Sequence, residues 1–269
     1  MGTGMPIDLK LKDKVAIVTG GSLGLGAETA RQMAAEGTKL VLVSRKEDPL
    51  EPICDELTKA HSADILPIIA DLTDPAAPDA IAKQTTDKFG RIDILANCAG
   101  AAQGGIFWEI PDAVWDQAFA LKFFATVRMM RAVIPAMRDQ KSGRIVTIVG
   151  DTGKQPNPRL LPGSASNAAL LAVTKGLADE VGPDGISVNA VNPGPTKTGR
   201  ITTLFDNLSR DTGKSLAEIE ADFTKDSPFK TMGDPVEVAR IVVFLCSDAA
   251  SNITGTSILT DGGRSRALA

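Results

Sequence analysis

The sequence predicts an α/β protein with a doubly wound parallel sheet. Short runs of valine, isoleucine and leucine alternate with longer segments of helical periodicity along the whole chain. A glycine-rich turn joins the first apolar run to the first helical segment. This alternation is typical of βαβ units, whose parallel strands are covered by helices on both faces.

The apolar runs predict strands at residues 15–18, 40–43, 65–69, 92–96, 145–149, 186–191 and 256–259. Helical periodicity bounded by turn residues predicts helices at residues 24–35, 75–89, 113–138, 164–180 and 235–245. A polar stretch from Arg200 to about Lys230 predicts an irregular substrate lid at about residues 198–230. We therefore expect an N-terminal extension at residues 1–10 and a single domain at residues 11–269.

The composition limits the kinds of partner. A chain of 269 residues that is 43% hydrophobic can bury one full core. The net charge of -4 argues against nucleic acid or an anionic membrane surface, since both favour basic patches. No run approaches the roughly 20 apolar residues of a membrane span, and no signal peptide is recognisable. We expect a cytoplasmic protein that binds a small molecule.

Cysteine and histidine are scarce. Cys54, Cys98 and Cys246 are widely spaced, which favours free thiols in a reducing compartment over disulfides or a zinc site. His61 is the only histidine and lies in a polar stretch, where we expect it at the surface. A metal site or a histidine-dependent catalytic triad is therefore not expected.

The turn after the first strand carries four glycines, Gly20, Gly21, Gly24 and Gly26. Glycine lets the backbone turn tightly and lets a pyrophosphate approach the amides at a helix N-terminus. The strand before this turn and the helix after it make a dinucleotide-binding site the preferred interpretation.

The spacing of these glycines resembles that of the short-chain dehydrogenase/reductase family. Further family motifs follow in order, namely Asp71-Leu72, Asn97-Cys98-Ala99-Gly100, Asn192-Pro193-Gly194-Pro195 and Asp261-Gly262-Gly263. The resemblance covers residues 11–263 and implies the strand order 3-2-1-4-5-6-7. It also implies a set of cofactor-binding residues: Gly20, Ser22, Leu23, Gly24, Leu25, Gly26, Ser44, Arg45, Asp71, Leu72, Asn97, Ala99, Gly100, Pro193, Gly194, Thr196 and Thr198.

The end of the second predicted strand indicates which dinucleotide is bound. The sequence there is Ser44-Arg45-Lys46, with no acidic residue to accept the ribose hydroxyls of NAD. Arg45 can pair with a 2′-phosphate through its guanidinium fork, which favours NADP(H). Leu23 stands where many NADP-dependent relatives carry a second basic residue, so NAD(H) stays the alternative.

The resemblance also implies a catalytic tyrosine, assisted by a lysine, a serine and an asparagine. The chain contains no tyrosine, and Gly163 occupies the position of that residue. Asn167, Gly150 and Lys122 occupy the positions of the lysine, the serine and the asparagine. None of the four family residues is present.

Lysine and asparagine have been exchanged between two of these positions. We hypothesise that Lys122 supplies a positive charge or a proton, because burial can bring a lysine pKa close to neutrality, while Asn167 donates hydrogen bonds. Lys122 could instead form a purely structural contact. Asp151 is a candidate general base or a turn-capping residue, and Ser164 offers a hydroxyl or an N-cap.

These features predict an NADP(H)-dependent oxidoreductase that acts on an alcohol or carbonyl substrate with non-standard proton delivery. The alternatives are a non-redox lyase or isomerase, and a dinucleotide-binding subunit without activity. The resemblance implies a homotetramer or homodimer formed through the helices at 113–138 and 164–180 and the last strand near Thr256. Apolar residues offered for substrate contact are Ile201, Leu204, Phe205 and Phe223 in the lid, and Phe107, Trp108 and Phe124 elsewhere, where packing is the alternative.

Overall fold

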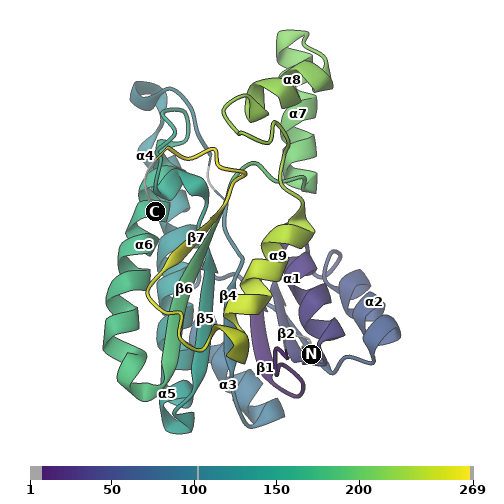
Figure 1. Cartoon of the computed structure of the whole chain (residues 1–269), viewed down its shortest axis with the longest axis vertical. Coiled ribbons are helices and arrows are strands. Elements are labelled where there is room, and N and C mark those ends of the chain that lie inside the picture. The colour runs from purple at the N-terminus through teal and green to yellow at the C-terminus, as the bar shows by residue number, and fades with distance from the viewer. Residues whose placement is uncertain (1–7, 102, 267–269) are drawn as a thin grey trace, which may run out of the picture.

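One parallel sheet lies between two layers of helices (Figure 1). The computed structural model describes residues 8–101 and 103–266, so the predicted extension at residues 1–10 is described only from residue 8. The described strands pair in the order β3-β2-β1-β4-β5-β6-β7, as predicted. They are β1 (Val15–Thr19), β2 (Lys39–Ser44), β3 (Ile65–Ile69), β4 (Ile94–Asn97), β5 (Gly143–Ile148), β6 (Ile186–Pro193) and β7 (Ser257–Thr260).

The helices divide between the two faces of the sheet. One core cluster joins the sheet to α1 (Gly24–Ala35), α2 (Glu51–His61) and α9 (Pro235–Leu245). A second cluster joins the opposite face to α3 (Ala77–Phe89), α5 (Ala125–Gln140) and α6 (Leu161–Val181). Successive residues of β1 alternate between the clusters, since Ala16 and Val18 lie in the first and Ile17 in the second. Both faces are covered, which explains why successive strand positions are apolar instead of alternating between apolar and polar residues.

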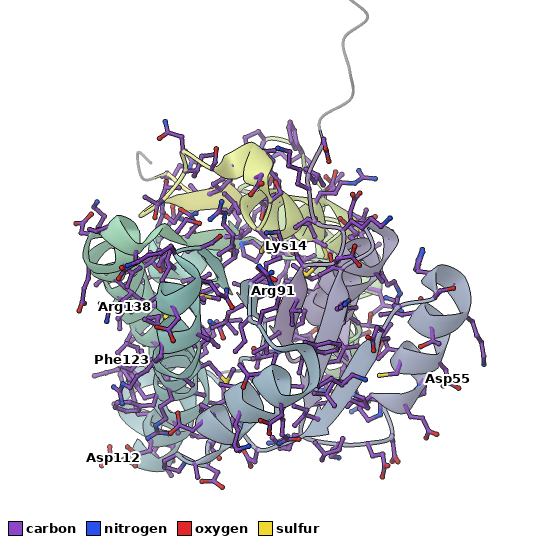
Figure 2. The ribbon with its side chains drawn as sticks, turned by 90° about the horizontal axis from the view of Figure 1, so that it is seen from below. Lys14, Asp55, Arg91, Asp112, Phe123 and Arg138 are labelled. Carbon is purple, nitrogen blue, oxygen red and sulfur yellow. The ribbon has the colours of Figure 1, made fainter. Side chains whose placement is uncertain are left out.

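The amino-terminal edge of the sheet is held by charge. The buried carboxylate of Asp93 accepts hydrogen bonds from the backbone N–H of Val15 and from Arg91, and it also pairs with Lys14. Figure 2 shows Lys14 and Arg91 close together near the middle of the view from below. These contacts join the beginning of β1 to the beginning of β4. The opposite, carboxyl-terminal edge is therefore the one that stays open for ligand contacts.

The polar stretch after β6 is helical, so the prediction of an irregular segment was wrong. It forms α7 (Gly199–Thr212) and α8 (Leu216–Thr224), which project together beyond the sheet (Figure 1). Ile201, Phe205 and Leu208 recur with helical spacing among polar residues and pack with residues of the second helix. Ser215 and Glu218 form a capping box at the start of α8.

Two further predictions about helices need correction. Helix α2 was missed, although Ile53 and Leu57 are buried at a helical spacing of four residues. The predicted helix at 113–138 is divided into α4 (Asp112–Ala118), a wide π turn η2 (Phe119–Phe124) and α5. Lys122 lies within this wide turn, a form that occurs frequently at functional sites.

The three cysteines are free thiols, with Cys246 buried and the other two half-buried, and His61 is exposed at the end of α2. Among the residues that the structure describes, no three or more His, Cys, Asp or Glu side chains are grouped so as to hold a metal ion. None of the helices in the described ranges has the length and apolar character needed to cross a membrane.

Candidate functional site

The candidate residues gather at the carboxyl-terminal edge of the sheet. The strand register places Thr19 opposite Asn97 and Asn97 opposite Thr147, so the ends of β1, β4 and β5 form one row. In this row the side-chain amide of Asn97 donates to the hydroxyl of Thr147 at 3.4 Å. Open α/β sheets bind ligands at this edge.

The glycine-rich turn is packed too tightly for side chains at two of its positions. A Cβ on Gly26 would overlap the carbonyl oxygen of Gly20, and one on Gly20 would lie 2.9 Å from the Cα of Ala99. Gly20 and Gly24 have φ of +65° and +56°, a backbone region that favours glycine. The turn therefore fixes the approach of α1 to β1 and β4.

The beginning of α1 is open to a ligand. Leu23 is the N-cap residue, provides no side-chain cap and is 68% exposed. A Cβ on Gly24 would meet only Thr198 at 3.7 Å, so the space above this turn is free of backbone. Uncapped amides at a helix N-terminus attract a phosphate group. Ser22 and Ser44 border the turn, with their hydroxyl oxygens 3.0 Å apart.

The end of β2 carries the residues predicted to select the cofactor. Arg45 is exposed, and its charge contributes to lowering the pKa of Asp71. The main cause of that lowered pKa is hydrogen bonding, because the Asp71 carboxylate accepts from the backbone N–H and the hydroxyl of Thr73 at 2.9 and 2.8 Å. Leu72 is buried beside them. This end of the sheet offers both an exposed guanidinium and a fixed carboxylate.

The loop after β4 lies between the glycine turn and Lys122. The backbone N–H of Ala99 donates to the hydroxyl of Thr19 at 3.2 Å. The side-chain oxygen of Asn97 is buried and has no hydrogen-bond partner among the described residues. A Cβ on Gly100 would lie 3.1 Å from the Cγ of Lys122, so the lysine stem runs along this glycine.

The loop after β6 completes the nucleotide side of the site. Pro193 is buried at the end of β6. Gly194 faces Asp261, and a Cβ added to Gly194 would lie 2.9 Å from the Cβ of Asp261. Thr196 forms a bridge with Gly233, which ties the segment before α7 to the segment before α9. Helices α7 and α8 with their connections are called the α7–α8 unit below. The residues predicted to bind a dinucleotide thus surround one edge. The open α1 terminus and the unpartnered Asn97 oxygen fit such a ligand.

Lys122 and Asn167 meet across the site. The ammonium of Lys122 in η2 donates a hydrogen bond to the side-chain oxygen of Asn167 in α6. The amide nitrogen of Asn167 in turn donates to the hydroxyl of Thr152 at 2.9 Å. Thr152 belongs to η3 (Asp151–Gly153), the short turn that follows β5. Three elements therefore contribute to one hydrogen-bond chain.

The environment of Lys122 favours loss of its proton. Burial is the main cause, and the nearby positive charge of Arg200 contributes; together they lower the pKa of Lys122 to about 8. Arg200 lies in the first turn of α7. At neutral pH the ammonium is therefore mostly charged, yet it can release a proton within the physiological range. A group with this pKa can act as a general acid and as a general base.

Asp151 and Ser164 lie apart from this chain of hydrogen bonds. Asp151 forms an ion pair with Arg264 at 2.8 Å, and its burial raises the pKa of its carboxyl. The hydroxyl of Ser164 donates to the carbonyl of Leu160 and accepts from the backbone of Asn157. Helix α6 begins at Leu161, so the N-cap interpretation of Ser164 was wrong. Both of the hydrogen bonds that the structure gives Ser164 are made with backbone groups.

Comparison with known proteins assigns the chain to a family. A family model described as enoyl-(acyl carrier protein) reductase matches residues 20–265. The chain belongs to the short-chain dehydrogenase/reductase family. This short-chain dehydrogenase/reductase is similar to the oxidoreductase UcpA of Escherichia coli strain K12, with 34% identity over 94% of this chain and 95% of UcpA. It is also similar to the 3-oxoacyl-[acyl-carrier-protein] reductase FabG of the same strain, with 31% identity over 95% of this chain and 98% of FabG.

A solved structure shows the same fold. The crystal structure of L-sorbose reductase from Gluconobacter frateurii, complexed with NADPH and L-sorbose, has a TM-score of 0.94 and 32% identity. The match covers 97% of this chain and 100% of the sorbose reductase chain. The family assignment makes this short-chain dehydrogenase/reductase an oxidoreductase.

Two residues of the site were missed or given little weight in the sequence. Arg264 pairs with Asp151 over a separation of 113 positions, and no motif surrounds it. Thr152 lies only two residues after Gly150, but its hydroxyl became a candidate only once Asn167 was seen to reach it. This short-chain dehydrogenase/reductase contains no tyrosine. That was the one signal in the sequence that indicated a search for other hydroxyl groups near Gly150 and Gly163.

The aromatic residues offered for substrate contact fall into two groups. Phe205 is buried in the core of the α7–α8 unit and packs on Phe223, with ring centroids 5.0 Å apart. The expectation that Phe205 contacts the substrate was therefore wrong, because its ring is covered by the unit's own side chains. Phe107, Trp108 and Phe124 are 58%, 82% and 47% exposed, so they do not pack in the core.

Proposed function

We propose that this chain is an NADP(H)-dependent oxidoreductase that interconverts a carbonyl compound and an alcohol, with Lys122 as the proton donor and acceptor. The observation that carries the proposal is the contact between Lys122 and Asn167 at the carboxyl-terminal edge of the sheet. It places a titratable group with a pKa of about 8 beside the loop after β4. The chain has no tyrosine to serve as the acid.

The choice of NADP(H) rests on Arg45 and on the absence of an acidic residue at the end of β2. An exposed guanidinium at that point can form a bidentate, charge-assisted pair with a 2′-phosphate. The open N-terminus of α1 would hold the pyrophosphate, and Asn97 to Gly100 would support the ribose side. The sorbose reductase that this chain resembles was solved with NADPH, which supports the same choice.

In the proposed reaction the dinucleotide, when bound, supplies or accepts a hydride. The residues of this chain orient the substrate oxygen and manage its proton. Reduction of a carbonyl requires one proton at the oxygen, and the Lys122 ammonium provides it and becomes a neutral amine. The hydrogen bond to Asn167 holds the ammonium in place. Oxidation of an alcohol uses the neutral amine as the base.

The α7–α8 unit is proposed as the substrate lid at residues 198–230. It has its own small core, and Thr198 at its beginning lies beside Gly24 of the nucleotide turn. Lys197 and Glu220 form an ion pair of 3.4 Å that links the connecting segment to α8. Movement of such a unit as one body would cover or open the site without exposing new apolar surface.

We further propose that the chain forms a homodimer or homotetramer through α5 and α6. A groove of about 930 Å³ runs between these helices and is lined by Met130, Ile134 and Leu177 among charged residues. Figure 2 shows Phe123 and Arg138 on the side of the molecule opposite Asp55 of α2, so this face is an outer flank. Analytical ultracentrifugation of the wild type and of Ile134→Glu checks the proposal. A wild type that sediments as a monomer contradicts it.

The function is tested by titrating NADPH and NADH against the purified protein while following nicotinamide fluorescence. NADPH oxidation is then measured with cyclohexanone, ethyl acetoacetate and L-sorbose. We expect binding of NADPH, turnover of at least one ketone, and a loss of about 10²-fold or more in kcat for Lys122→Met. Lys83→Met is the matched control, because Lys83 is exposed on α3 and its ion pair within the described ranges is with Asp87.

Three outcomes of this experiment would contradict the proposal. Absence of NADPH binding removes the oxidoreductase function. NADPH binding without turnover of any ketone favours the non-redox enzyme or the binding subunit. Turnover that Lys122→Met leaves unchanged removes Lys122 from the mechanism.

A further inference from the structure

Thr152 lies at the end of a directed hydrogen-bond chain. Lys122 donates to the side-chain oxygen of Asn167, and the amide nitrogen of Asn167 donates to the hydroxyl oxygen of Thr152 at 2.9 Å. Thr152 and Asn167 are both buried. The chain therefore begins at a charged group and ends at a neutral hydroxyl.

The chemistry of the three groups fixes the direction of these hydrogen bonds. An ammonium has three donors and no acceptor, so only the oxygen of the Asn167 amide can face Lys122. The amide nitrogen must then face Thr152, and it can only donate. The Thr152 oxygen is consequently an acceptor in this contact, and its own proton is left for another partner. Among the described residues, the structure provides no acceptor for that proton.

The charge of Lys122 strengthens the donor at the other end of the chain. A hydrogen bond from an ammonium polarises the amide, and the polarised amide withdraws electron density from the hydroxyl that it contacts. In a site of low dielectric this effect is larger than in water. The Thr152 hydroxyl is therefore a better donor than an isolated threonine.

Gly150 leaves space beside this hydroxyl. A Cβ on Gly150 would lie 3.1 Å from the amide nitrogen of Asn167 and 3.8 Å from the hydroxyl oxygen of Thr152. Both polar groups thus border the space that a side chain on residue 150 would occupy, and Gly150 leaves this space empty. The η3 turn itself is fixed, because a Cβ on Gly153 would lie 3.0 Å from the Cβ of Asn167. The hydroxyl is held rigidly at the end of β5, where open sheets bind their ligands.

We propose that the Thr152 hydroxyl is a catalytic donor that binds the carbonyl oxygen of the substrate. This role of Thr152 rests on the proposed function, in which Lys122 delivers the proton to the same carbonyl oxygen. Thr152 keeps its own proton throughout and stabilises the negative charge that develops on the oxygen. The Asn167 amide spans the two donors, so one substrate oxygen can contact both Lys122 and Thr152.

Three variants test this proposal in steady-state kinetics with NADPH and the best ketone of the panel. Thr152→Val removes the hydroxyl and keeps the shape of the side chain, whereas Thr152→Ser keeps the hydroxyl and removes the methyl group. Thr85→Val is the control, because it removes a buried hydroxyl from α3 whose hydrogen bond among the described residues is donated to the carbonyl of Ile81. We expect Thr152→Val to lower kcat by about 10²-fold with a much smaller change in KM, as for loss of one oxyanion donor. Thr152→Ser should recover most of the loss, and Thr85→Val should match the wild type.

A Thr152→Val variant that keeps half of the wild-type kcat overturns the proposal. So does a Thr152→Ser variant as impaired as Thr152→Val. Circular dichroism and NADPH fluorescence of each variant show whether the fold and the nucleotide site are intact.

A spectroscopic measurement separates this proposal from the proposed function. Infrared difference spectra are recorded for cyclohexanone bound with NADP⁺, a combination in which no reduction can occur. Donation from Thr152 lowers the carbonyl stretching frequency in the wild type relative to Thr152→Val, whether or not the protein turns over any ketone. Equal frequencies in the two proteins overturn the proposal, and so does a wild-type spectrum without a band for bound ketone.

Discussion

The carboxylate of Asp151 and the guanidinium of Arg264 form an ion pair of 2.8 Å that joins the end of β5 to the C-terminal segment. Both side chains are largely buried, with 11% and 24% of their surface exposed. The backbone N–H of Arg266 also donates to the side chain of Gln155 at 2.6 Å. The segment after β7 is therefore fastened onto the turn that carries Thr152.

Removal of Arg264 should destabilise the protein in a pH-dependent way. Arg264→Met leaves a buried carboxylate without its partner, and we expect a loss on the order of 2 kcal/mol at pH 7 in urea unfolding. Burial already raises the pKa of Asp151, and the loss of Arg264 raises it further. A carboxyl whose pKa is raised by folding is destabilising above that pKa, so the deficit should shrink as the pH falls from 7 to 5.

The matched control for this prediction is Arg210→Met, since Arg210 is exposed on α7. The double variant Asp151→Asn with Arg264→Met should recover part of the lost stability. An equal loss at both pH values would show that charge is not the cause.

The pH dependence of turnover should follow Lys122. With a pKa of about 8, the ammonium required for reduction is present below pH 8 and disappears above it. We expect the kcat for ketone reduction to fall about tenfold per pH unit above pH 8, and the kcat for alcohol oxidation to fall similarly below it. Lys122→Arg keeps the charge without a titratable proton, because arginine stays protonated. It should bind NADPH and have a low kcat that is independent of pH in this range.

A methyl group at Gly26 should damage the nucleotide site. The added Cβ would overlap the carbonyl oxygen of Gly20, so α1 must move away from the turn. We expect Gly26→Ala to lower the free energy of unfolding by about 2 kcal/mol and to abolish NADPH binding in the fluorescence titration. Gly176→Ala is the contrasting variant, because its Cβ would meet no atom within 4 Å and the residue lies inside helix α6. It should be neutral or stabilising by up to about 1 kcal/mol.

Arg45 should determine the preference between the two dinucleotides. Arg45→Met removes a charge-assisted hydrogen bond to the 2′-phosphate, and we expect NADPH affinity to fall about 10- to 100-fold. NADH affinity should change little, since NADH has no phosphate at this position. Lys59→Met on α2 is the control for the general loss of a positive charge. Equal weakening of both dinucleotides would assign Arg45 to a structural role.

The architecture of the sheet could be predicted because its central strands β1, β4 and β6 are buried on both faces. The run at residues 65–69 contains no polar side chain, and its bounds were predicted without error. The other strands begin or end one or two residues from the predicted positions. Helices α1 and α9 were equally accurate, since glycine or proline begins each of them. The lid helices were missed because the apolar residues of α7 occupy only one narrow face among many polar residues.

The site could be predicted only in part. Lys122 and Asn167 were expected in one pocket, and the structure places them in hydrogen-bond contact. The ion pair of Asp151 could not be foreseen, because its partner lies on a segment without a motif. The contact between Asn167 and Thr152, which leaves the Thr152 proton for another partner, depends on how η3 and α6 pack, and no spacing in the sequence provides that packing.

The wide turn η2 shifts the helical phase between α4 and α5. A π turn contains one residue more than an α turn, so α4 and α5 differ in phase by about 100°. The core positions Met129, Val133 and Met137 of α5 are thereby set independently of the residues that η2 turns toward the site. A change of one residue in chain length, rather than a series of substitutions, is enough to bring a different side chain to face Asn167. Chemistry at this edge can therefore be altered while the packing beneath it stays the same.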